Sequence, residues 1–276
     1  TVAAGLESGK MTGNETYQCN GSLTVVEGQK PIKCHSYRVG GDGIVSVAGA
    51  VERSCNVALM KMGQTIGKTT FLKYMQDFNF GLKTNIDLYG EARTASLVFT
   101  EDSMGPMELA TASFGQGFNV TMIQMAAGFS SLINGGYYYE PHMVSKITAS
   151  DGSVVQNIEP RLLKQTVSES TSAKIRDYCV DVVMGEHGTG HTARPAGYII
   201  GGKTGTAETQ PRGNRQYVVS FIGFAPADDP QIAISVVIEQ GWHGYTGAPV
   251  ARDILDAYFS SDVTAQEPQQ SGTLLP

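Results

Sequence analysis

The sequence lacks an excess of positive charge and any long apolar run, and each absence excludes a class of protein. Of its 276 residues, 20 are Lys or Arg and 26 are Asp or Glu, so the formal net charge is −6, and the basic residues are scattered singly. A nucleic-acid surface needs clustered basic residues, so we exclude nucleic acid as a partner. No apolar stretch approaches the roughly 20 residues that cross a bilayer, and no basic segment leads into an apolar one at the start. We therefore expect neither an anchor nor an export signal within this sequence.

Cysteine is also scarce, because the four residues Cys19, Cys34, Cys55 and Cys179 are too few for a disulfide-built scaffold. Cys19 and Cys34 bracket a segment, 25–30, that has the character of a hairpin. Two alternatives stay open for this pair: a disulfide, if the protein works outside the cell, or free thiols. No spacing of cysteine and histidine resembles a metal site, so the sequence predicts neither a metal nor another cofactor.

We interpret two further patterns as features of ordinary loops and not as ligand-binding sites. His187 and His191 flank glycines in a loop, and we interpret them as polar loop residues. The glycines at 115 and 117 precede a helix, but there is no Gly-x-Gly-x-x-Gly and no Lys-Ser/Thr behind them, which argues against a nucleotide site.

Hydrophobic periodicity divides the chain into helical and strand-like segments. Helical spacing covers residues 1–9, 46–60, 70–78, 121–134, 168–185 and 248–259. Arg53, Ser54, Cys55 and Asn56 interrupt the second of these, and because Ser and Asn favour caps and turns, we expect a junction between two helices there. Strand character covers residues 17–37 and 138–158, the latter with a hairpin turn at Asp151-Gly152.

The C-terminal half contains three strand-like segments joined by short loops. They are the segment around 199–208, Tyr217–Phe224 and Ile232–Ile238, the last with apolar residues alternating at period two. Short connections predict an antiparallel meander. Helices precede, flank and follow this sheet, so the fold class is α and β within one domain. The polar segment 261–276 is expected to be disordered.

The first strand of the meander carries Lys203-Thr204-Gly205-Thr206. A lysine, two hydroxyls and a glycine along an extended strand make an edge suited to a carboxylate, where a peptide backbone can also pair. We expect Lys203 and a threonine hydroxyl to face one groove. The alternative is an ordinary surface strand.

Ser54-Cys55-Asn56 followed at long range by Lys203-Thr204-Gly205-Thr206 resembles the second and third active-site motifs of penicillin-recognising serine acyltransferases. The flanking sequence resembles class B penicillin-binding proteins in particular, at Phe114–Gly117, Val120-Thr121, Asn134–Gly136 and Ser220–Pro226. The resemblance reaches to about residue 260. It implies an α/β fold of the α+β type, an antiparallel sheet with helices on both faces plus a helical subdomain.

The resemblance implies a D,D-transpeptidase that crosslinks peptidoglycan stem peptides ending in D-Ala-D-Ala and that is acylated by β-lactam antibiotics. Ser54 would relay a proton to the leaving nitrogen, Asn56 would hold the acyl side's amide, and Lys203 would supply positive potential. Thr204 and Thr206 would hold the terminal carboxylate, with Gly205 between them leaving room for the substrate. The backbone N–H of Thr206 would be one oxyanion donor.

One motif of the family is missing, the Ser-x-x-Lys that carries the nucleophile. No lysine of this chain has a serine three positions before it, and the threonines that do occur there lie in the wrong places along the chain. In the family this motif begins the helix whose continuation resembles residues 1–9. We therefore expect residues 1–260 to be a transpeptidase domain without its N-terminal part, with the nucleophile upstream of Thr1, and we expect this chain alone to be inactive.

Other functions remain open at this stage. A D,D-carboxypeptidase or a serine β-lactamase would use the same motifs with water as the acceptor, and a β-lactam or stem-peptide binding module would use them without turnover. The resemblance also implies a location on the extracytoplasmic face of the bacterial cell membrane. There the full-length protein would be anchored by a segment absent here and could work with a membrane glycosyltransferase.

Overall fold

The computed structural model describes residues 1–209, 211, 213, 216–241 and 247–260. The described helices are α1 (Val2–Glu7), α2 (Val47–Glu52), α3 (Asn56–Ile66), α4 (Lys68–Asp77), α5 (Pro106–Ser113), α6 (Met122–Ile133), α7 (Glu169–Met184) and α8 (Ala248–Ser260), with short 3-10 helices at His35–Val39, Ala95–Leu97 and His191–Ala193. None of the helices in this part of the chain is both long and apolar enough to span a membrane. The predicted disordered tail, 261–276, lies outside the described residues.

The largest sheet is the predicted meander. Strands β9 (Gly201–Glu208), β10 (Tyr217–Ala225) and β11 (Ile232–Gly241) pair antiparallel in the order β9-β10-β11. The register places Lys203 opposite Ile222 and Gly205 opposite Ser220. Lys203-Thr204-Gly205-Thr206 therefore lies on the first strand of the meander, which is an edge of this sheet.

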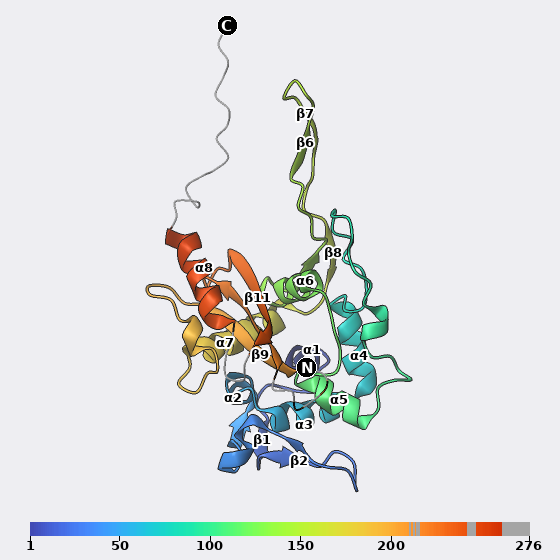
Figure 1. The fold of residues 1–276 in the computed structure, drawn as a ribbon, viewed down its shortest axis with the longest axis vertical. Helices are drawn as coiled ribbons and strands as arrows, with labels where there is room; N and C mark the ends of the chain where they lie inside the picture. Colours follow the sequence, from blue (N-terminus) through green and yellow to red (C-terminus); the bar gives the residue numbers. More distant parts are fainter. Residues whose placement is uncertain (210, 212, 214–215, 242–246, 261–276) are drawn as a thin grey trace.

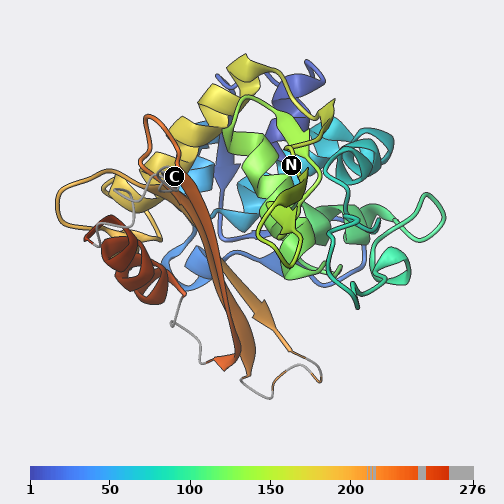
Figure 2. The same ribbon diagram turned by 90° about the horizontal axis from the view of Figure 1, so that it is seen from above.

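Helices cover both faces of this sheet, and residues of β10 pack on each side because side chains alternate along a strand. Phe221 belongs to a buried cluster with Ala251 and Leu255 of α8, whereas the ring of Phe224 lies 6.1 Å from that of Phe129 in α6. Figure 2 shows α8 on one side of the sheet and α6 on the other. The predicted fold class, an α+β domain with helices on both faces of an antiparallel sheet, is confirmed.

The remaining helices form the helical part of the molecule around a second, larger core. It contains buried residues of α1 to α7, and Phe224 of the sheet belongs to the same cluster. The helix α6 begins with a capping box, in which the side chains and backbone N–H groups of Thr121 and Gln124 bond reciprocally. The helix α7 starts at the Ser168 cap and ends before Gly185, as predicted.

Short two-stranded sheets make up the rest of the strand structure. They are β1 (Thr16–Cys19) with β4 (Gly43–Ser46), β2 (Ser22–Leu23) with β3 (Ile32–Lys33), β5 (Tyr137–Tyr139) with β8 (Leu162–Gln165), and β6 (Lys146–Thr148) with β7 (Val154–Asn157). The predicted hairpin around 25–30 is present as β2–β3. The predicted turn at Asp151-Gly152 joins β6 to β7, whose residues are all exposed, and this hairpin projects far from the body of the molecule (Figure 1).

One alternative left open by the sequence is resolved, and one expectation needs correction. All four cysteines are buried free thiols, so Cys19 and Cys34 are not joined by a disulfide. The sulfur of Cys34 instead lies 4.0 Å from that of Cys55. The strand character at 138–158 divides differently than expected, because Tyr137–Tyr139 pairs with Leu162–Gln165 and only the later residues form the hairpin.

Candidate active site

Ser54 lies at the junction between α2 and α3, where the chain reverses. The Ser54 N–H donates to Val51 O at 3.1 Å and the Cys55 N–H donates to Ala50 O at 2.9 Å. These two bonds define a Schellman motif, in which the residue after the helix adopts the left-handed conformation. That residue is Ser54, with φ of 55°, at a position where glycine is usual. The turn therefore presents the Ser54 side chain at the end of α2 under backbone strain.

Lys203 reaches this turn from the sheet. Its Nζ donates to Ser54 Oγ at 2.8 Å and to Thr204 O at 3.0 Å. Burial lowers the pKa of Lys203 to about 8, although the nearby Cys179 opposes the shift. The Lys203 ammonium therefore loses its proton at a lower pH than an ordinary lysine does. Burial in turn raises the pKa of Cys179 to about 12, so this cysteine of α7 remains a thiol. The structure thus joins two motifs 149 positions apart in one contact.

The other predicted residues lie around this contact. The Asn56 side chain, at the start of α3, donates from Nδ2 to Lys33 O at 3.4 Å. Thr204 Oγ1 lies 2.8 Å from Thr189 Oγ1, so the Thr204 hydroxyl bonds to a neighbouring loop while Lys203 bonds to Ser54. Thr206 is exposed, and Gly205 would meet only the Ser220 side chain if it carried a Cβ.

Three residues that the sequence did not single out support this arrangement. Glu52, at the end of α2, accepts from the His187 N–H at 2.9 Å and thereby holds the loop between α7 and β9. Thr189 of that loop reaches Thr204, and the Gln116 side chain donates to Thr206 O at 3.5 Å. Long-range contacts of this kind leave no local pattern, although Gln116 does lie in the Phe114–Gly117 segment that carried the resemblance.

His187 lies in the loop after α7, as interpreted, whereas His191 begins the short 3-10 helix His191–Ala193, and its Nε2 is 2.6 Å from Gly185 O. A different group gathers residues with metal-ligand chemistry. Cys19, Cys34, Asp42 and Cys55 offer ligand atoms that all lie within 4.8 Å of one another. The sequence did not indicate this cluster, because its members come from four separate segments and show no recognisable spacing.

A strained serine in a helix junction, contacted by a partly buried lysine on the edge strand of an antiparallel sheet, is the arrangement of a penicillin-recognising acyltransferase. The family model for the penicillin binding protein transpeptidase domain matches residues 1–256, and the chain belongs to this family.

Individual relatives agree with this membership. Stage V sporulation protein D of Bacillus subtilis is 37% identical over 264 residues, covering 92% of this chain and 40% of that protein. The peptidoglycan D,D-transpeptidase MrdA of Acinetobacter baumannii is 29% identical over 246 residues, covering 82% of this chain and 36% of that protein. The chain therefore spans about 40% of the length of these curated relatives. The crystal structure of penicillin binding protein 3 from Mycobacterium tuberculosis complexed with aztreonam aligns with a TM-score of 0.81 and 26% identity, covering 94% of this chain and 60% of that one.

Proposed function

We propose that this chain is part of a D,D-transpeptidase domain that crosslinks peptidoglycan by acyl transfer from stem peptides ending in D-Ala-D-Ala. The observation that carries the proposal is the 2.8 Å contact between Lys203 Nζ and Ser54 Oγ. This contact places the Ser54 hydroxyl, which can carry a proton, beside the cationic Lys203 ammonium. Amide acyl transfer needs a proton for the leaving nitrogen and positive potential for the developing charge.

Each motif residue then has one role in the proposal. Ser54 passes a proton from Lys203 toward the leaving D-Ala nitrogen, and Asn56 holds the amide of the acyl side. Thr204 and Thr206 receive the terminal carboxylate beside Gly205, and the Thr206 backbone N–H donates to the oxyanion. Family membership and the Lys203–Ser54 contact support these roles.

The nucleophile itself, in this proposal, is the serine of a Ser-x-x-Lys motif preceding Thr1. The position of α1 is consistent with that placement. Thr1 Oγ1 donates to Ser113 O at 2.7 Å, at the end of α5. Three residues further on, Gln116 contacts Thr206 O. Thr1 is therefore bonded close to the segment that contacts the strand of Thr206.

The experiment compares the protein at its natural length with the 276-residue chain, using a fluorescent penicillin. We expect covalent labelling of the former and none of the latter. Stoichiometric labelling of the 276-residue chain would show that the nucleophile lies within it.

A second measurement follows release of D-Ala from a stem peptide by the natural-length protein, with and without an amine acceptor. Crosslinked product in the presence of the acceptor supports a transpeptidase. Equal release with water alone identifies a carboxypeptidase, and binding without release identifies a non-catalytic module.

We also propose that the natural-length protein is anchored in the bacterial membrane, with this domain on the extracytoplasmic face, where it works beside a membrane glycosyltransferase. The crosslinking substrate lies outside the cell, which supports this placement. Protease added to intact spheroplasts should degrade the domain. Protection until lysis would contradict the proposal.

A further inference from the structure

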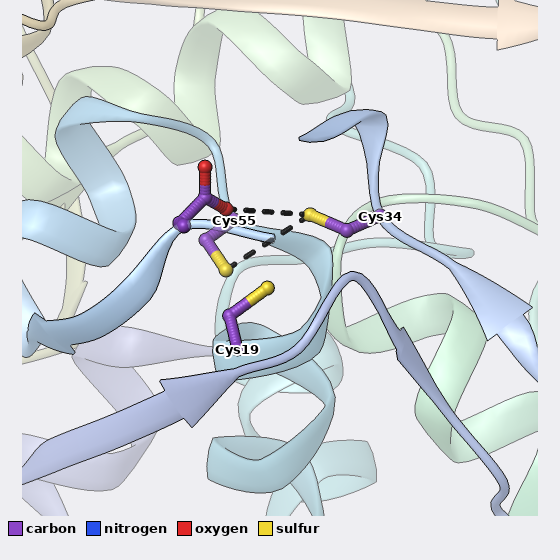
Figure 3. Close-up of side chains that lie close together, drawn as sticks. Cys19, Cys34 and Cys55 are labelled. Carbon is purple, nitrogen blue, oxygen red and sulfur yellow. Dashed lines mark hydrogen bonds between the residues drawn. The ribbon is translucent and has the colours of Figure 1, made fainter. Parts of the chain in front are cut away.

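The cluster formed by Cys19, Cys34, Asp42 and Cys55 adjoins the turn that carries Ser54, because Cys55 is the next residue in the chain. Cys19 ends β1, Cys34 precedes the 3-10 helix at His35–Val39, Asp42 precedes β4, and Cys55 is the N-cap of α3. Cys34 Sγ lies 4.0 Å from Cys55 Sγ and 3.5 Å from Asp42 Oδ2. Figure 3 shows the three sulfur atoms converging from three different segments.

The spacing fits a tetrahedral metal. Zinc bound by thiolates at about 2.3 Å places its sulfur ligands about 3.8 Å apart, close to the observed separation of Cys34 and Cys55. Three cysteines with one carboxylate oxygen also make a donor set that zinc accepts. The cysteines are at most 4% exposed and the Asp42 side chain 8%, so water does not compete for the site.

The side chains in this space are those that a cation would bind. The Cys34 sulfur lies within hydrogen-bond distance of both the Cys55 sulfur and the Asp42 carboxylate. Zinc binds cysteine as the thiolate, so a divalent cation bound here would replace thiol protons.

The segments that carry the ligands are held in place by other contacts. Lys61 Nζ of α3 donates to Gln18 O at 2.7 Å, next to Cys19, and Asn56 donates to Lys33 O, next to Cys34. Gly41, with φ of 99°, packs so closely on Cys19 O that a Cβ there would collide with it. Ser36 Oγ, two residues after Cys34, is buried without a hydrogen-bond partner among the described residues. It is suitably placed to donate to a metal-bound ligand.

We propose that Cys19, Cys34, Asp42 and Cys55 bind one zinc ion, which fixes the turn that carries Ser54 and Asn56. Cys55 lies between these two residues in sequence, so a bond from its sulfur to zinc anchors the turn to β1 and β4. A disulfide would use only two of the three sulfurs and leave a buried thiol beside a carboxylate. The site stands independently of the proposed reaction, because its ligands are defined by geometry alone.

The test is the metal content of the natural-length protein, purified with reductant and then dialysed against a mild chelator. We expect one zinc per molecule by elemental mass spectrometry. Replacement of zinc by Co²⁺ should give the intense thiolate-to-cobalt absorption of sulfur coordination. Cys34→Ser and Asp42→Asn should lose the bound zinc. Cys179→Ser, which changes a buried cysteine outside the cluster, should retain it.

The wild-type measurements decide the proposal even where a variant fails to fold. Folded, reduced protein that holds no zinc and gives no cobalt–thiolate absorption overturns it. A disulfide between any two of Cys19, Cys34 and Cys55 in protein isolated without reductant overturns it as well. A role in fixing the turn predicts that a strong chelator slows acylation by a β-lactam and that added zinc restores it, whereas reductant alone does not.

Discussion

Ser54 has a strained backbone, and its hydroxyl contacts Lys203 at 2.8 Å. A non-glycine residue in the left-handed region costs about 1–2 kcal/mol, which glycine at the same position would not. The serine is therefore maintained at this position for its side chain rather than for the stability of the turn, which is the pattern expected at a functional site.

A pair of substitutions separates these two properties of Ser54. Ser54→Gly and Ser54→Ala both remove the hydroxyl, so both should abolish most β-lactam acylation in the natural-length protein. Only glycine relieves the backbone, so Ser54→Gly should be more stable than Ser54→Ala by about 1 kcal/mol in urea unfolding. Equal stabilities would mean that residue 54 is not left-handed.

Lys203 makes stability depend on pH in a defined window. Its pKa is lowered to about 8 in the folded protein, whereas an unfolded lysine has a pKa of about 10.4. Between these values the unfolded state binds more protons, so the free energy of unfolding should rise as pH rises from about 8 to about 10.4, by up to about 3 kcal/mol. Lys203→Met keeps the apolar length but cannot titrate, so the difference between wild type and variant should isolate this slope. Parallel curves would contradict the shifted pKa.

At the level of elements, two glycines of β9, Gly202 and Gly205, lie close to side chains of β10. A Cβ on Gly202 would collide with the Phe221 ring and lie 2.7 Å from Ile222 O. A Cβ on Gly205 would meet only the Ser220 hydroxyl, which can rotate away. Gly202 is thus required for packing of the strand, while Gly205 leaves space beside the threonines.

The two glycines should therefore respond differently to alanine. Gly202→Ala should destabilise the domain by about 1–3 kcal/mol through overpacking, whereas Gly205→Ala should cost clearly less. Thermal unfolding of both variants measures this difference. If Gly205→Ala were the more destabilising, the register of β9 against β10 would be wrong.

The elements also show how far the sequence alone could predict the structure. The meander, the helices α6 and α7 and the junction at Ser54 all follow from local patterns. The helix α5 was not anticipated, because Pro106–Ser113 is short and lies beyond a long irregular segment. Of the predicted site residues, Lys203 and Ser54 are in direct contact. The contributions of Glu52, Thr189 and the cysteine cluster depend on contacts between distant segments and could not be predicted.

On the scale of the whole molecule, the site lies where the helical part meets the sheet. Ser54 and Asn56 belong to the helical part, and Lys203 belongs to the sheet. The larger core spans this boundary, because it contains Phe224 of β10 together with Cys55. The distance between Lys203 and Ser54 therefore depends on how the two parts pack.

Two core substitutions test this dependence. Phe224→Ala and Leu255→Ala each remove a fully buried side chain and should each cost about 2–5 kcal/mol. Phe224 packs between the sheet and α6, so its loss should also slow β-lactam acylation under conditions where both variants are folded. Leu255 belongs to α8 and packs on the opposite face of the sheet, so its loss should leave the acylation rate closer to wild type. Equal rates would show that the boundary packing does not set the site.

The β6–β7 hairpin contacts solvent along its whole length, and its base is closed by a bond from the Ile158 N–H to Ser145 O at 2.9 Å. Its hydrogen bonds are mostly its own, so a change at the tip displaces no core side chain. The turn at Asp151-Gly152 is consequently a suitable site for inserting a label. An epitope or a fluorophore inserted there would report on the location and rotation of the domain in living cells while leaving the site untouched.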